Sequence, residues 1–327
     1  MTELAIDLTI SISLHDWILS IAICNMTRVI YSLYIDIPKD ELDPQPPYHN
    51  DTMPKTLRTK EKMAQYYDWL KAMQQSYADA IGVEYKLFHY DEQYIKFKDT
   101  FANKPYITTY NIVNFYKVHL MYELAKTYDE ILYIDFDVVP LENESFFNHW
   151  NLKQNGMAIL SNRKHINLTL HKMIVDRELH EEFGANPSYT SNRSPTAKYW
   201  NCRALLSENN MSGANDVYNT GIVGVTSDQL KQLAYFENFD ELLQEMKELK
   251  EDEYSMYPPH ITDMFGWDNE TIWSYKMQLN NCTAQLLTSE WHHFMDHHSW
   301  IAHGSKFVHV INKDFAHVKD WYEKNNI

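Results

Sequence analysis

The first half of the chain alternates between apolar runs and amphipathic stretches. Residues 59–81 and 111–130 carry apolar side chains at steps of three or four, which predicts two helices. Short apolar runs at 17–24 (WILSIAIC), 83–90 (VEYKLFHY) and 131–135 (ILYID) have the length of strands. Strand, helix, strand, helix, strand in this order is typical of an α/β fold with a central, mostly parallel sheet.

The second half is less regular but continues the pattern. Apolar runs at 156–162, 217–225 and 306–313 predict three further strands, and the charged, amphipathic segment 240–250 predicts a helix. The polar stretch from about 185 to 215 is expected to form irregular loops. Because no break in composition divides the chain, we expect a single α/β domain, with a Rossmann-like sheet flanked by helices.

Composition excludes several classes of protein. The formal net charge of -16, with no cluster of Lys and Arg, argues against a nucleic-acid partner. Three widely spaced cysteines suggest neither disulfides nor a thiolate zinc site. The run 17–24 falls short of the roughly 20 residues of a membrane span, so no integral membrane segment and no signal peptide are expected, and a cytoplasmic location fits. Nothing in the sequence indicates an oligomeric state.

The stretch ILYIDFDVVP places Asp135 and Asp137 directly after a predicted buried strand. Ligands of open parallel sheets bind beyond the carboxyl ends of the strands, and residues two apart on an extended segment point to the same side. Two neighbouring carboxylates repel each other unless a cation or a proton joins them, and Mn²⁺ or Mg²⁺ is the natural occupant. The alternative is that the pair only ends the strand and forms a turn.

Lys117 lies four residues from both Val113 and Met121, on the apolar side of its predicted helix. One interpretation is that its ammonium reaches solvent at the edge of the apolar stripe. The other is that it pairs with an anion near the two aspartates. With eight glycines in 327 residues and no glycine-rich phosphate loop, such an anion would depend on this lysine and a metal.

Two further hypotheses stay open on the residues alone. Asp135 to Val139 satisfies the Asp-x-Asp-x-Thr/Val pattern of haloacid dehalogenase-like phosphatases, in which Asp135 would be the nucleophile. Against this, the nucleophile there normally follows the first strand of the domain, whereas 134 residues precede Asp135. A non-catalytic carbohydrate-binding protein is the other hypothesis, since nine Trp and 23 Tyr could stack on sugars.

Several segments together resemble the retaining glycosyltransferases of family 8 and their GT-A fold. Tyr116 and Lys117 correspond to a tyrosine and a basic residue on the helix before the D-x-D motif, with Lys in place of the commoner Arg. VYNTGIVGV is similar to the family's Asn-x-Gly strand, and GWDNETIW to its acidic-amide motif. KFVHVINKD resembles the terminal strand with its metal-binding histidine, although the glycine and Pro-Trp of the family's form are missing.

The resemblance implies a function and a role for each motif. The chain would move a hexose from a nucleotide sugar, expected to be UDP-linked, to a glycan or other hydroxyl acceptor with retention of configuration. Residues 1–160 would form the nucleotide-sugar-binding half and 161–327 the acceptor-binding and catalytic half of one domain. The expected metal ligands are Asp135, Asp137 and His309; the expected catalytic residues are Asp268, Asn269 and Glu270; the expected donor-binding residues are Cys24, Asn25, Lys117, Phe136, Asn219, Thr220, Gly221 and Lys313.

Overall fold

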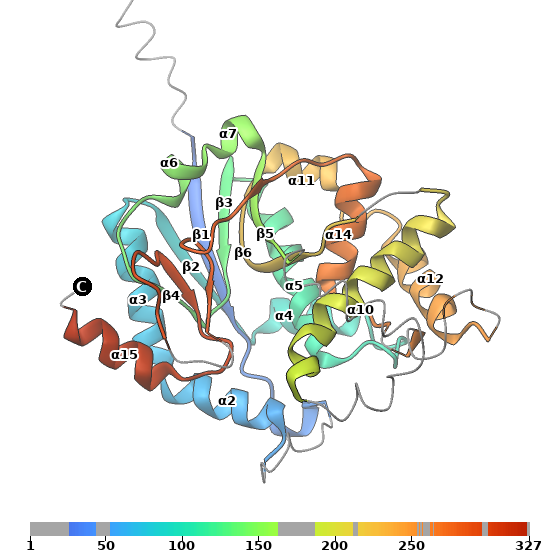
Figure 1. The fold of residues 1–327 in the computed structure, drawn as a ribbon, viewed down its shortest axis with the longest axis horizontal. Helices are drawn as coiled ribbons and strands as arrows, with labels where there is room; N and C mark the ends of the chain where they lie inside the picture. Colours follow the sequence, from blue (N-terminus) through green and yellow to red (C-terminus); the bar gives the residue numbers. More distant parts are fainter. Residues whose placement is uncertain are drawn as a thin grey trace, which may run out of the picture.

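A six-stranded sheet forms the centre of the protein (Figure 1). The structure is a computed structural model, and it describes residues 26–43, 53–162, 187–211, 215–253, 255, 257, 262–263, 265–295 and 300–325. The strand order is β2-β1-β3-β6-β5-β7, and β6 is antiparallel to both of its neighbours while the other pairings are parallel. The strands are β1 (Arg28–Tyr34), β2 (Glu84–His89), β3 (Glu130–Ile134), β5 (Met157–Ser161), β6 (Tyr218–Thr226) and β7 (Gln285–Leu286).

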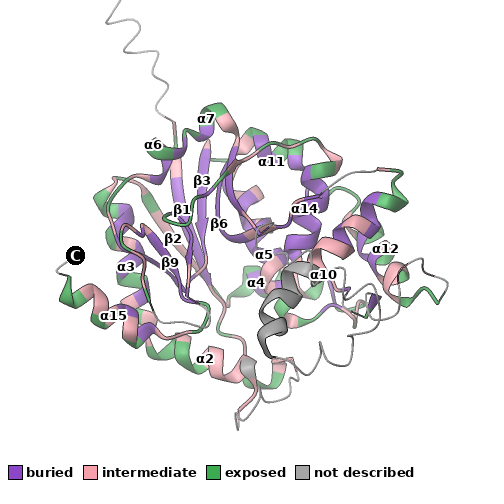
Figure 2. Cartoon of the chain, viewed as in Figure 1, coloured by how far each residue is buried: buried purple, intermediate pink, exposed green. Residues whose placement is uncertain are grey.

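Helices cover both faces of this sheet, so its central strands are buried on both sides (Figure 2). Alternate residues of β1 show the arrangement: Val29 and Tyr31 pack into one apolar core and Ile30 into another. On the first side lie α4 (Glu92–Asp99), α5 (Thr109–Leu124), α10 (Pro187–Glu208), α11 (Ser227–Leu233), α12 (Phe239–Glu251) and α14 (Asn269–Leu279). On the other lie α2 (Lys55–Gln65), α3 (Tyr67–Ala80) and α15 (Phe315–Lys324), with the short α6 (Phe146–Trp150) and α7 (Leu152–Asn155) at one end of the sheet.

A second, three-stranded sheet brings the end of the chain to the loop after β3. It has the order β4-β9-β8, with β4 at Val138–Pro140, β8 at His293–Phe294 and β9 at Phe307–His309. The antiparallel register pairs Val138 with His309. This sheet therefore places a histidine from the last part of the chain beside the aspartates that precede β4.

Most of the elements predicted from the apolar pattern are confirmed. The strands expected at 83–90, 131–135, 156–162, 217–225 and 306–313 correspond to β2, β3, β5, β6 and β9, and the helix expected at 240–250 is α12. The single helix expected at 59–81 is two helices, α2 and α3, separated at Tyr66. The mostly parallel α/β sheet is also confirmed.

Two predictions need correction or lie out of reach. The irregular loop expected at 185–215 is wrong, since Pro187–Glu208 forms α10, which buries Cys202 and Leu205 in the core. The strand expected at 17–24 lies outside the described residues, and the first strand that the structure describes is β1, at Arg28–Tyr34. Within the described part of the chain, no helix combines the length and apolar character that crossing a membrane would require.

Candidate active site

The segment between β3 and β4 holds the two aspartates at the carboxyl end of the central parallel strands. The backbone N–H of Asp135 donates to the carbonyl of Gly221 (2.7 Å), and the N–H of Val138 donates to the carbonyl of Asp135 (2.9 Å). Behind this turn, the buried amide of Gln74 donates to the carbonyls of Asp135 (3.0 Å) and Val138 (2.9 Å). A turn tied on both sides presents its two carboxylates in a fixed geometry.

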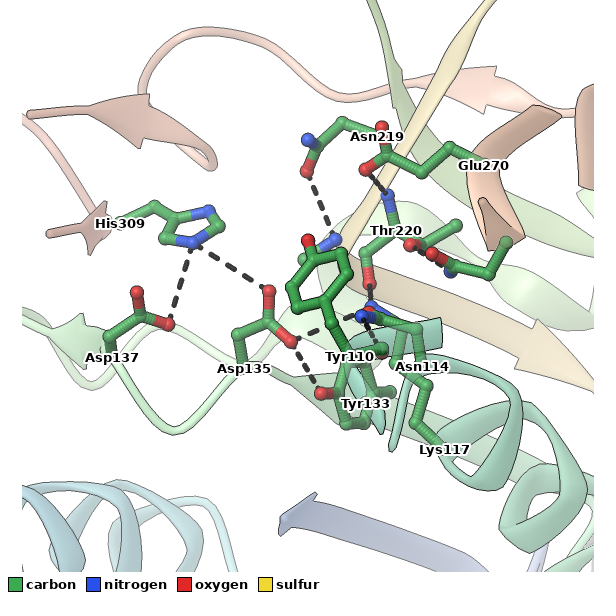
Figure 3. Close-up of polar contacts among 12 residues, drawn as sticks. Tyr110, Asn114, Lys117, Tyr133, Asp135, Asp137, Asn219, Thr220, Glu270 and His309 are labelled. Carbon is green, nitrogen blue, oxygen red and sulfur yellow. Dashed lines mark hydrogen bonds and ion pairs between the residues drawn. The ribbon is translucent and has the colours of Figure 1, made fainter. Parts of the chain in front are cut away.

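Asp135, Asp137 and His309 converge on one point (Figure 3). The Nε2 atom of His309 lies 3.6 Å from Oδ2 of Asp135 and 3.5 Å from Oδ1 of Asp137. One ligand atom from each residue falls within 4.8 Å of the others, as a shared metal ion requires. Two carboxylate oxygens and an imidazole nitrogen are suitable ligands for a divalent ion.

Asp137 is the more deeply buried of the two acids, with 6% of its surface exposed. Its Oδ2 atom accepts a hydrogen bond from the ammonium of Lys313. Burial favours the neutral carboxyl, but the ammonium of Lys313 and the hydrogen-bonding ring of His309 outweigh burial and hold the pKa of Asp137 well below its usual range. Asp137 is therefore ionised at neutral pH and able to bind a cation.

Lys117 points into the protein, toward the side chains of Asp135 and His309. The interpretation in which its ammonium reaches solvent is therefore wrong. Only 3% of the residue is exposed. Its Nζ atom donates to the carbonyl of Thr220 (3.1 Å), lies 3.6 Å from Oδ1 of Asp135, and sits 5.1 Å from the centre of the Tyr133 ring. The helix that carries it begins with Thr108 and Asn111 in a reciprocal capping box.

The start of β6 lines the other side of the cluster because β6 runs antiparallel to β3. The side-chain oxygen of Asn219 accepts a hydrogen bond from the N–H of Gly221 (3.0 Å). The carbonyl of Gly221 in turn accepts one from the backbone N–H of Asp135. A Cβ atom on Gly221 would lie 2.5 Å from Cε1 of His309 and 2.9 Å from Oδ2 of Asp135. Glycine is required here because the backbone passes directly against the cluster.

The first turn of α14 supplies the third group of predicted residues. Asp268 caps the helix by accepting the N–H of Thr271 (2.9 Å), and Asn269 donates from its side-chain amide to the hydroxyl of Thr220 (2.7 Å). Glu270 accepts the backbone N–H of Thr220 (3.0 Å) and binds the ammonium of Lys198. Asn269 and Glu270 are thus joined to Thr220, whose carbonyl contacts Lys117, while Asp268 holds the start of the helix.

Lys198 of α10 determines the charge of this acidic turn. Burial raises the pKa of Asp268 and acts in the same direction on Glu270, but Lys198 outweighs burial at Glu270 and holds the pKa of that carboxyl below its usual value. The two acids in turn hold the pKa of Lys198 above its usual range, against its own burial. Glu270 is therefore an ionised, internally paired carboxylate.

Replacing Lys198 with methionine should lower the free energy of unfolding by about 2–3 kcal/mol, because Glu270 would keep a buried charge without its main partner. The double variant with Glu270→Gln should recover most of this loss, as a double-mutant cycle in chemical denaturation would show. If the loss of unfolding free energy in the double variant equalled the sum of the losses in the two single variants, the pair would not be coupled.

Three predicted donor-binding residues remain. Cys24 and Asn25 lie outside the described residues. Phe136 is buried, and its ring packs against Tyr34 (5.1 Å between centroids) and Tyr67 (5.5 Å). Donor binding by these three residues stays a prediction.

Sequence reasoning missed several residues that shape the site. Lys198, Gln74 and His292 come from segments without a recognisable motif, and their partners are distant in sequence. Tyr110, in the first turn of α5, is 63% exposed and stands beside the charged groups in Figure 3. Because exposure is a property of the folded chain, the sequence alone gives no signal that singles out this ring.

The structure combines an α/β sheet of the GT-A type with an Asp-x-Asp pair at the carboxyl end of β3, a histidine that completes the cluster and a buried lysine beside it. The glycosyl transferase family 8 model matches residues 30–262, and the chain belongs to that family. The protein is therefore a transferase enzyme, and the phosphatase and non-catalytic binding hypotheses are set aside. No curated protein matches the chain.

Several solved structures are similar to this one at low sequence identity. A glycosyltransferase involved in glycosylation of the major capsid of PBCV-1 is 11% identical, with 91% of this chain and 99% of that chain covered and a TM-score of 0.41. The galactosyltransferase LgtC with donor and acceptor sugar analogs is 11% identical, with 86% of each chain covered and a TM-score of 0.37. Mouse xyloside xylosyltransferase 1 is 9% identical, with 87% and 97% covered and a TM-score of 0.40.

Proposed function

We propose that this chain is a metal-dependent, retaining hexosyltransferase that uses a UDP-sugar donor and a glycan or other hydroxyl acceptor. The observation that carries the proposal is the cluster of Asp135, Asp137 and His309, with the ammonium of Lys117 3.6 Å from Asp135. A Mn²⁺ or Mg²⁺ ion held there would stabilise the negative charge of the departing diphosphate. Lys117 contributes a second, fixed positive charge for the same oxygens.

The protein's own groups orient the donor around this point. Asn219, at the start of β6, presents its side-chain amide beside the cluster, and Thr220 joins it to the α14 turn. Asp268 and Glu270 share a single cationic partner, Lys198, and the negative charge left over favours the positive charge that develops at the anomeric carbon as the sugar–phosphate bond breaks. The acceptor hydroxyl then attacks the anomeric carbon from the face that the diphosphate leaves and passes its proton to the departing phosphate oxygen, so that the configuration is retained without an enzymic nucleophile.

The two halves of the chain divide this work in the proposal. Residues 1–160 contribute the D-x-D turn and Lys117 and bind the nucleotide sugar, and residues 161–327 contribute α10 and α14 and bind the acceptor. The carboxyl end of β1 lies beside that of β3, with Tyr31 paired to Tyr133. Ile35 and Asp36, which follow β1, are therefore further candidates for contact with the nucleoside, in addition to Cys24 and Asn25.

Thermal-shift screening with UDP, GDP and CMP, each with and without Mn²⁺, tests the proposal. UDP with Mn²⁺ at about 100 times the dissociation constant should add about 2.7 kcal/mol of stability, a shift of several degrees. Transfer from UDP-sugars followed by NMR of the anomeric proton then tests the stereochemistry. Stabilisation by UDP that is equal with and without Mn²⁺ would contradict metal dependence. A product of inverted configuration would contradict the retaining mechanism.

His292 fixes the orientation of the proposed metal ligand. Its Nε2 atom lies 3.0 Å from Nδ1 of His309, which leaves Nε2 of His309 facing the aspartates. Outer partners of this kind typically contribute a factor of 10–100 to metal affinity, so we expect His292→Phe to weaken Mn²⁺ binding by about that factor. Isothermal titration calorimetry measures this directly, and His292→Gln, whose side chain keeps a hydrogen-bonding group, should recover part of the affinity.

A further inference from the structure

The negative and positive charges of the side chains around Asp135, Asp137 and His309 already balance one another without any ligand. Asp135 faces the ammonium of Lys117, and Asp137 binds the ammonium of Lys313. With the imidazole of His309 neutral, as metal binding through its Nε2 atom requires, the two carboxylates and the two ammonium groups cancel. A divalent cation and the doubly charged diphosphate of a nucleotide sugar also cancel, so the site is balanced when both are bound but not when either is bound alone.

Lys313 occupies a position that opposes a cation at this site. Its ammonium binds one oxygen of Asp137, while the other oxygen of the same carboxylate faces His309. A metal ion that enters the cluster therefore approaches a positive charge on the same buried carboxylate. Like charges repel strongly where water is largely excluded, because the local dielectric constant is low.

The backbone at Lys313 indicates that this placement is specific. Its φ angle is +59°, in the left-handed region that glycine adopts more easily, and its N–H donates to the carbonyl of Val310 (3.0 Å) in a tight turn after β9. A left-handed conformation is unfavourable for a residue with a side chain.

We propose that Lys313 acts as an internal counter-ion that makes metal and diphosphate bind cooperatively. Lys313 weakens binding of the ion by itself. When the diphosphate is present, Lys117 and Lys313 gain phosphate oxygens as partners, and the repulsion of the ion is offset. The donor then binds together with its metal ion, and neither occupies the site firmly alone. This inference rests on the proposed function and deepens it.

Calorimetric titration of Mn²⁺ with and without UDP, corrected for the Mn²⁺–UDP complex in solution, tests the coupling. In the wild-type protein UDP should raise the affinity for Mn²⁺ at least tenfold, and Mn²⁺ should raise the affinity for UDP by the same factor. In Lys313→Gln, Mn²⁺ alone should bind at least fivefold more tightly, and the effect of UDP on Mn²⁺ affinity should fall at least fivefold.

Two further variants keep the test decisive. Lys306→Gln is the control, because the side chain of Lys306 is exposed to a similar degree as that of Lys313 (19% against 20%) but pairs with Glu142 and Glu144. This variant should leave the affinities for Mn²⁺ and UDP unchanged. Lys313→Gly removes the ammonium while suiting the backbone, so it should fold and behave as Lys313→Gln does.

The outcomes separate this inference from the proposed function. Unchanged or weaker Mn²⁺ binding in Lys313→Gln and Lys313→Gly, with UDP still coupled as in the wild type, would overturn the inference and leave the proposed function standing. A wild-type protein that binds neither Mn²⁺ nor UDP would overturn both.

Discussion

Replacing Asp137 with asparagine is expected to reduce the rate of sugar transfer by about 10³-fold, equivalent to about 4 kcal/mol of transition-state stabilisation. The amide would keep the shape of the side chain but lose the negative charge that Lys313 and His309 hold in the ionised form. The proposed metal ion would then lose one of its two carboxylate ligands. Initial rates with a UDP-sugar at saturating Mn²⁺, measured beside the wild type, provide the comparison.

The same variant should also show a characteristic pH dependence of stability. Because the folded-state pKa of Asp137 is lowered, its ion pairs stabilise the protein fully above the unfolded-state pKa of about 4, and this stabilisation is lost as the pH falls further. Asp137→Asn should therefore be less stable than the wild type at pH 7, with a difference that shrinks below about pH 4.

Asp228→Asn, at an exposed pair with Lys231, is the control and should change neither rate nor stability. Full activity in Asp137→Asn would exclude a metal-binding role for this residue.

The elements that carry the D-x-D chemistry were predictable because their signals are local. Asp135 and Asp137 directly follow the apolar strand that contains Ile131, and Lys117 lies four residues from Val113 and Met121 on its helix. A motif within one element needs no knowledge of packing. The strand at Arg28–Tyr34 was not predicted, although its aromatic and β-branched residues favour a strand.

The supporting residues of the site could not be predicted because their partners depend on the tertiary structure. Lys198 contacts Glu270 only because α10 packs across α14, and α10 lies in a stretch whose polar composition suggested loops. Gln74 looks like one of several glutamines on an amphipathic helix, yet it is fully buried and braces the D-x-D turn. Tertiary packing outweighs local propensity at both positions.

The role of Gly221, near the start of β6, can be tested by substitution with alanine. Its backbone dihedral lies outside the left-handed region, so alanine is permitted conformationally, and the whole effect of Gly221→Ala comes from the added methyl group. That group would lie 2.8 Å from Nδ1 of His309 and 2.9 Å from Oδ2 of Asp135, closer than van der Waals contact allows. His309 and Asp135 must then move apart, and metal ligands tolerate only small displacements.

We therefore expect Gly221→Ala to weaken Mn²⁺ binding and to lower the transfer rate by about 10²-fold or more, while much of the native stability remains. Calorimetry with Mn²⁺ and thermal unfolding of the same preparation measure the two effects. Gly224→Ala, three residues along β6, gives the contrast: its methyl group would meet the ring of Phe146 at 2.3 Å, so stability should fall while the metal ligands stay in place. Gly266→Ala, with no atom within 4 Å, should change neither. If Gly221→Ala lost stability as Gly224→Ala does but bound Mn²⁺ normally, the glycine would serve packing and not the metal cluster.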